Sequence, residues 1–168
     1  MRRFFALCAI LCFLLIGCSP GNTRPLLWYQ ESLTEVSLQD GNTVWRMTPV
    51  PGGYTAEILS PASAEGITLT VTETDAQARL GDVCIPVSRS MTVACDDLFS
   101  LFCLTEEELI GLDAPGDDPE GITCARFRLS DREIALGLTA DGLPAFFDIT
   151  IDGITSRVFV TDMACGDD

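Results

Sequence analysis

The chain has 168 residues with 25 acidic and 10 basic side chains, a formal net charge of −15, and neither lysine nor histidine. This composition excludes nucleic acid as a partner, because phosphate binding needs clustered basic residues. It also excludes Ser-His-Asp and Cys-His catalysis, imidazole metal sites and lysine Schiff bases. We therefore predict no catalytic residues, no cofactor and no metal, and we expect the chain not to be an enzyme.

The first predicted element is an export signal. Residues 1–3 form a basic head, and residues 4–17 are 14 uncharged, mostly apolar residues. A membrane-spanning helix needs roughly 20 such residues, so this run is too short. A basic head followed by a short apolar run is typical of a secretory signal peptide.

The end of this run resembles the bacterial lipobox. Leu15, Ile16 and Gly17 precede Cys18. The resemblance implies that signal peptidase II removes residues 1–17 and that Cys18 carries acyl chains such as palmitate, which anchor the chain at the extracytoplasmic face of the cell membrane. The alternatives are an ordinary secretory signal that contains a cysteine, or an uncleaved anchor.

The rest of the chain is predicted to be a tether and one domain. Residues 18–31 are assigned to the tether and residues 32–168 to the domain, a length that supports one hydrophobic core. Removal of residues 1–17 takes away two arginines and no acid, which leaves 8 basic and 25 acidic residues and a net charge of −17.

The first half of the domain predicts a meander of six short strands. Apolar residues alternate with polar ones around Val36 and Leu38 and in residues 43–48, 54–60, 67–72, 76–80 and 83–87, and turn residues separate these stretches. Strands in this order, with no helix-length insert, predict antiparallel pairing.

The spacing then changes to that of a helix. Residues 93–112 predict two short helices, the second starting at a capping box formed by Thr105 and Glu108. Four more strands are predicted at residues 121–129, 133–138, 145–151 and 155–162. Asp152-Gly153 lies between the last two and predicts a tight hairpin. The fold class is mainly β (α+β): a curved antiparallel sheet, or incomplete barrel, of about ten strands with one or two helices on its concave side.

This order of elements behind a lipobox resembles the LolA-like lipoprotein-carrier fold, in which helices plug the apolar concave side of an incomplete barrel. The stretches that carry the resemblance are residues 54–61 (YTAEILSP), 65–69 (EGITL) and 141–144 (DGLP). It covers most of residues 33–162 and extends to small uncharacterised or germination-type lipoproteins of Firmicutes. It implies binding of an apolar ligand, an acyl chain or a lipoprotein or peptide segment, or a role in envelope assembly.

Large apolar residues on both faces of two strands suggest an apolar groove lined by Trp45, Met47, Phe146 and Phe147. The alternative is that the helices fill this space completely. The chain would then be a structural module that binds a protein of the envelope or spore layers.

Three further groups of residues have plainer explanations. The five cysteines after Cys18 favour reduced, packed thiols, with one disulfide among Cys84, Cys95 and Cys103 as the alternative; the other two are Cys124 and Cys165. The acidic residues Asp113, Asp117, Asp118 and Glu120 fit a solvated loop better than a calcium site. Arg126, Arg128 and Arg132 are expected to pair with acidic residues.

Overall fold

The computed structural model describes residues 25–113 and 121–166. The predicted signal peptide, the lipobox, and the acidic residues Asp117, Asp118 and Glu120 lie outside these ranges.

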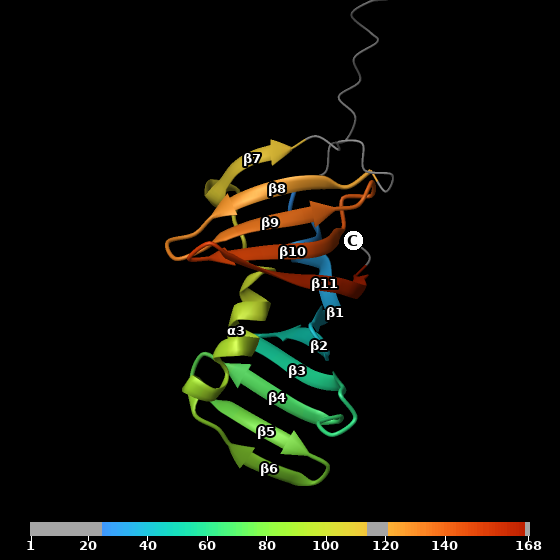
Figure 1. Cartoon of the computed structure of the whole chain (residues 1–168). Coiled ribbons are helices and arrows are strands. Elements are labelled where there is room, and N and C mark those ends of the chain that lie inside the picture. Colours follow the sequence, from blue (N-terminus) through green and yellow to red (C-terminus); the bar gives the residue numbers. More distant parts are fainter. Residues whose placement is uncertain (1–24, 114–120, 167–168) are drawn as a thin grey trace, which may run out of the picture.

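The described residues form one antiparallel sheet with eleven strands in the order β6-β5-β4-β3-β2-β1-β11-β10-β9-β8-β7 (Figure 1). The two halves of the meander meet where β1 pairs with β11, and the sheet is not closed into a barrel. The strands are β1 (Leu33–Asp40), β2 (Thr43–Val50), β3 (Gly53–Ser60), β4 (Ile67–Thr72), β5 (Ala76–Leu80), β6 (Val83–Pro86), β7 (Leu109–Asp113), β8 (Thr123–Arg128), β9 (Glu133–Leu138), β10 (Pro144–Ile151) and β11 (Ile154–Cys165). The predicted fold class is confirmed.

Strand alternation gives the sheet one apolar face, which we call the core face. Residues paired across neighbouring strands point to the same side, so the fully buried Val36, Met47 and Ala56 mark this face on β1, β2 and β3. Phe147 and Leu136 mark it on β10 and β9. The predicted Asp152-Gly153 hairpin is also present, and both residues have positive φ values of 50° and 79°.

The helix α3 (Val93–Ser100) lies between the two halves of the sheet (Figure 1). It packs on the core face through aromatic contacts: the ring of Phe99 stacks on Tyr54 of β3 with centroids 4.6 Å apart. Just after the helix, Phe102 contacts Phe147 of β10 edge-to-face at 5.3 Å. One short helix and the residues that follow it therefore join both halves of the sheet into a single core.

The second predicted helix is much shorter than expected. Its capping box is present, since the Glu108 carboxylate accepts hydrogen bonds from the Thr105 amide and hydroxyl at 2.9 and 3.1 Å. The helix ends after one 3₁₀ turn, η2 (Glu106–Glu108), and Leu109–Asp113 become the edge strand β7. Another short 3₁₀ turn, η1 (Arg89–Met91), precedes α3.

The packed part of the chain includes residues that the sequence assigned to the tether. The one-turn helix α2 (Tyr29–Ser32) places Tyr29 in the core with 0% of its surface exposed, and Leu27 is 8% exposed. The rings of Phe102 and Tyr29 meet edge-to-face, with their centroids 6.5 Å apart. Leu27 and Tyr29 therefore pack into the core of the described structure.

Candidate functional site

The apolar core face continues past the helix onto β4, β5 and β6, where it becomes exposed. One row of paired residues crosses five strands as Met47, Ala56, Leu69, Ala78 and Ile85. Met47 and Ala56 are 0% exposed, whereas Ile85 at the end of the row is 54% exposed. The same face of the sheet therefore changes from packed core to open surface within five strands.

A neighbouring row repeats this gradient. Trp45 pairs with Ile58, whose carbonyl oxygen accepts a hydrogen bond from the Gly66 amide at the start of β4. The row continues through Ile67, which pairs with Leu80, and ends at Val83. Leu80 is 57% and Val83 is 65% exposed.

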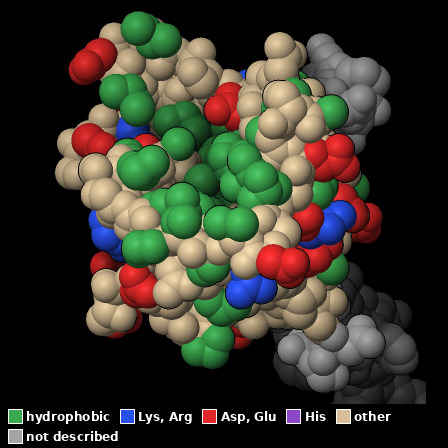
Figure 2. Space-filling view, turned by 90° about the horizontal axis from the view of Figure 1, so that it is seen from below, with side chains coloured by type: hydrophobic (Ala, Val, Ile, Leu, Met, Phe, Trp, Pro, Cys, Tyr) green, Lys and Arg blue, Asp and Glu red, His purple; other side chains and the backbone are tan. Residues whose placement is uncertain are grey.

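These exposed residues line a cavity of about 350 Å³ with almost entirely apolar walls. Its lining consists of Ile67, Ala78, Arg79, Leu80, Val83 and Ile85. Figure 2 shows hydrophobic side chains gathered around a hollow on the face seen from the β6 end of the molecule. The volume lies in the range of small-molecule binding pockets, roughly 300–1,000 Å³. We call this surface the β4–β6 site.

The four residues predicted to line a groove lie in different surroundings. Met47 and Phe147 are fully buried in the core. Trp45 is half-buried on the core face, in the row that leads to Val83. Phe146 lies on the opposite face of the sheet, where the Arg157 guanidinium sits 4.0 Å from its ring centroid.

Sequence reasoning missed the residues that line the β4–β6 site. Leu80, Val83 and Ile85 were recognised as strand residues, but alternation alone does not tell whether a helix covers that face. The signal that distinguishes them is position: β6 is the last strand before α3, and a helix of eight residues is about 12 Å long. It cannot cover six strands, each about 4.8 Å from the next.

A partly buried polar cluster fixes the helix beside the β4–β6 site. The Tyr54 hydroxyl donates to one Asp96 carboxylate oxygen at 2.6 Å, and the Thr92 hydroxyl donates to the other at 2.7 Å. Arg89 lies 3.8 Å from the same carboxylate. Burial, together with the hydrogen bond to Asp96, raises the pKa of Tyr54 well above its usual value, so the phenol stays protonated and keeps donating.

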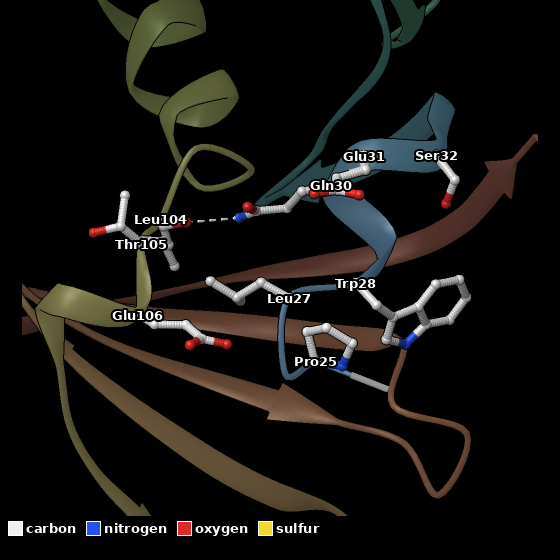
Figure 3. Close-up of a pocket in the computed structure, with 9 residues that line it drawn as sticks. All are labelled: Pro25, Leu27, Trp28, Gln30, Glu31, Ser32, Leu104, Thr105 and Glu106. Atoms are coloured by element: carbon white, nitrogen blue, oxygen red, sulfur yellow. Dashed lines mark hydrogen bonds between the residues drawn. The ribbon is translucent and has the colours of Figure 1, made fainter. Parts of the chain in front are cut away.

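A second cavity, of about 440 Å³, lies between the N-terminal segment and η2 (Figure 3). Leu27 and Trp28 form its apolar walls, and Glu31 and Glu106 place carboxylates in its lining. The Gln30 side-chain amide donates to the Leu104 carbonyl oxygen at 3.1 Å and joins the two segments. With both carboxylates in its lining, this cavity suits an apolar ligand less well than the β4–β6 site does.

The remaining predicted groups behave as ordinary structural elements. Arg126 pairs with Asp113 at 2.7 Å, Arg128 with Glu133 at 2.9 Å, and Arg132 with Asp97 and Asp131 at 3.0 and 3.1 Å. The arginine pairing predicted from the sequence is confirmed.

The five described cysteines are free thiols, with Cys95 buried and Cys84 and Cys103 exposed. Within residues 25–113 and 121–166, no group of three or more Cys, Asp or Glu residues is arranged to hold a metal ion. No helix in these ranges is both long and apolar enough to span a membrane.

Comparison with known proteins finds no matching family model and no matching curated sequence. Several solved structures are similar to this chain. An uncharacterised conserved protein of Thermus thermophilus has 19% identity and a TM-score of 0.46 over 79% of this chain and 78% of its own.

The lipoprotein LppX of Mycobacterium tuberculosis has 12% identity and a TM-score of 0.41 over 82% and 94% of the two chains. A LolA superfamily protein of Nitrosomonas europaea has 12% identity and a TM-score of 0.35 over 79% and 84%. The predicted resemblance to a LolA-like lipoprotein fold agrees with the names of these two structures. The similarity to lipoproteins of Firmicutes stays a prediction.

Proposed function

We propose that this protein is a non-catalytic lipoprotein, anchored through Cys18 at the extracytoplasmic face of the membrane, that binds an acyl chain in the β4–β6 site. The observation that supports this function is that the apolar core face continues onto β5 and β6, where its side chains are exposed. Leu80, Val83 and Ile85 are each more than half exposed and point into the same cavity. Exposed apolar patches that adjoin a cavity mark binding surfaces more often than isolated apolar residues do.

The shape of the surface favours a long apolar ligand over a compact one. The row from Trp45 to Val83 crosses four inter-strand steps, which together span about 19 Å. Arg79 is the charged residue in the lining, but it pairs with Cys84, so its side chain lies on the opposite face of the sheet and the cavity walls are apolar. An extended acyl chain along this row would bury apolar side chains at about 25 cal/mol per Å².

Fatty-acid uptake by charge variants tests this site. A chain without residues 1–17 and with Cys18→Ser, which therefore carries no acyl chains, is titrated with a fluorescent fatty acid. Leu80→Asp and Ile85→Asp are expected to weaken uptake by about tenfold or more, because a carboxylate in the cavity must lose its hydration when the ligand binds. Both positions are more than half exposed, so the unfolding midpoint should change little.

The matched control is Ile154→Asp. Ile154 is 74% exposed at the β10–β11 turn, far from the cavity lining, and its variant should bind as the parent does. Native mass spectrometry of the parent should also show co-purified lipid. A parent that takes up no fatty acid, or three variants that bind alike, would refute the β4–β6 site.

The anchor is tested separately in the full chain. Cys18→Ser should either release the protein from the membrane fraction or leave an unprocessed precursor, because the acylation site is lost. Membrane retention of a cleaved Cys18→Ser form would contradict lipidation while leaving the ligand site open to its own test.

A second candidate function is a structural module that binds an envelope protein. The packing of α3 favours it: Phe99 and Phe102 fill the space between the halves of the sheet, and Met47 and Phe147 have no exposed surface. The two functions differ in the titration above, since this module would take up no fatty acid.

A further inference from the structure

The two outer strands of the described sheet, β6 and β7, are protected to different degrees against pairing with another chain. An edge strand presents unpaired backbone groups unless charge, proline or a bulge blocks it. β7 follows three glutamates, ends at Asp113 and has a register shift between Leu109 and Gly111. β6 has no charged residue, and all four of its residues are exposed. Only Pro86, at its end, limits pairing.

The local charge around β6 points to a second copy of this chain as the partner. The whole chain carries −15, so two copies repel each other over most of their surface. The β5–β6 hairpin, residues 76–86, carries one arginine and one aspartate, Arg79 and Asp82, for a local net charge of zero. Contact between two β6 strands therefore brings together the part of each copy that lacks the acidic surplus.

The hairpin register shows which backbone groups of β6 face outward. Leu80 pairs with Val83 across the two-residue turn, and Ala78 pairs with Ile85. The Val87 amide continues this series by donating to the Ala76 carbonyl oxygen at 2.9 Å. In an antiparallel ladder alternate pairs exchange hydrogen bonds, so the amide and carbonyl groups of Cys84, between these pairs, point away from β5.

This arrangement is self-complementary about Cys84. We propose that two copies pair antiparallel through β6, with Cys84 opposite its own counterpart and two reciprocal hydrogen bonds between the two Cys84 backbones. Val83 of each copy then lies opposite Ile85 of the other on the core face, where both side chains are now more than half exposed. The Cys84 thiols lie together on the other face of the sheet, the one on which Cys84 contacts Gln77 at 3.3 Å.

The dimer would place two β4–β6 sites next to each other in one continuous apolar surface. It does not depend on the proposed ligand, because strand pairing and apolar burial exist without one. A contact made by two four-residue strands buries less than a typical stable interface of about 1,600 Å². We therefore expect a reversible dimer that increases with concentration.

Oxidative cross-linking tests the register of this dimer. A mixture of ¹⁴N- and ¹⁵N-labelled full chain in detergent is treated with diamide, which takes up two electrons and two protons as two thiols form one disulfide. Directly opposed residues in a hydrogen-bonded pair have Cα atoms about 5.5 Å apart, within the range for a disulfide. The expected product is a heavy–light peptide joined through Cys84 of each copy.

The matched control moves the thiol to an equally exposed site outside the edge. The double variant Cys84→Ser, Ser63→Cys should form at least about fivefold less dimer than the parent, since random collision is its only route. Equal yields from the two chains would overturn the proposal. A Cys84 link to a different protein in membranes would also overturn it, because the partner would then not be a second copy.

A proline at the centre of β6 tests the backbone contact without a disulfide. Cys84→Ser keeps the backbone N–H of residue 84, which points away from β5. Cys84→Pro removes this N–H but leaves the hydrogen bonds between β5 and β6 in place. Sedimentation should show dimerisation of the serine variant and about tenfold weaker dimerisation of the proline variant. Equal dimerisation refutes strand pairing. Fatty-acid uptake per chain should be the same in both, since residue 84 points away from the cavity.

Discussion

Two buried tyrosines differ in whether their hydroxyl groups are satisfied. Tyr54 is 3% exposed and donates to Asp96, whereas the hydroxyl of Tyr29, at 0% exposure, has no hydrogen-bond partner in the described part of the chain. Tyr54→Phe should lower the free energy of unfolding by about 1.5–3 kcal/mol, because it removes a bond to a charged acceptor. Tyr29→Phe should be neutral or stabilising by about 1 kcal/mol.

Denaturant unfolding of the two single variants measures this contrast. Each variant removes the same atom from a buried ring, so the loss of the oxygen atom itself is matched between them. Equal destabilisation by the two changes would show that Asp96 does not anchor α3 through Tyr54.

The thiol of Cys95 predicts how stability depends on alkaline pH. Burial, and secondly the nearby Asp96 carboxylate, raise the pKa of Cys95 from 9.0 to about 11. The unfolded chain then loses this proton at lower pH than the folded chain does. The contribution to stability is therefore complete below pH 9 and is lost as pH rises from 9 to about 11, in total about 2–3 kcal/mol.

Urea unfolding of the parent and of Cys95→Ala between pH 8 and pH 11.5 isolates this contribution. Other groups that titrate in this range, among them the tyrosines, are common to both proteins. The difference in unfolding free energy between them should shrink as pH rises through 9 to 11. A constant difference would mean that the Cys95 thiol ionises as readily in the folded chain as in the unfolded chain.

At the scale of elements, the strands were predictable and the chain segments next to them were not. Alternation of apolar and polar residues is a local property, and it located ten of the eleven strands. Residues 109–112 were assigned to a helix because the capping box at Thr105 and Glu108 is real, but nothing local shows that the helix stops after one turn. Pairing with β8 across Phe127 and Ala125 decides the matter, and this contact is distant in sequence.

The close pairing of β3 and β4 depends on a glycine. A Cβ atom on Gly53 would overlap the Val71 carbonyl oxygen and approach the Thr72 Cα at 2.9 Å. These are backbone atoms and cannot rotate away. Gly53→Ala should therefore lower the unfolding free energy by about 1–3 kcal/mol, because the two strands must move apart.

Gly111→Ala is the control for this change. Gly111 also lies in a strand, β7, and a Cβ atom there meets no atom within 4 Å. Its unfolding midpoint should match the parent or rise slightly, since alanine restricts the unfolded chain. Similar losses for the two variants would point to a general intolerance of side chains rather than to the β3–β4 contact.

At the scale of the whole molecule, the candidate site depends on what α3 leaves uncovered. The sequence indicated strands with large apolar residues on both faces, which need a second layer of helix or ligand, and the predicted helical cover is present. It placed these apolar residues at Trp45, Met47, Phe146 and Phe147. The helix α3 and the residues that follow it cover the core face at Met47 and Phe147. The exposed apolar residues lie three to four strands away from Met47, at Leu80 to Ile85. Helix placement is a tertiary property, so alternation could not reveal this shift.

Because α3 covers only part of the core face, we expect the free energy of local opening to differ between the strands. β1 lies between β2 and β11, and its Val36 and Leu38 are buried, whereas β6 pairs on one side only and all its residues are exposed. Local opening of β5 and β6 should therefore need much less free energy than opening of β1, β9 or β10. In hydrogen exchange of the Cys84→Pro chain, amides of β5 and β6 should exchange far earlier than those of β1.

Addition of palmitate should slow exchange selectively in β4, β5 and β6, because a ligand stabilises the closed form in proportion to its occupancy. The comparison uses the proline variant so that protection by a second copy does not contribute. If β6 in this variant is as protected as β1 before any lipid is added, then part of the chain covers the β4–β6 site and the acyl-binding function is wrong. If palmitate protects all strands alike, it binds elsewhere and acts on global stability alone.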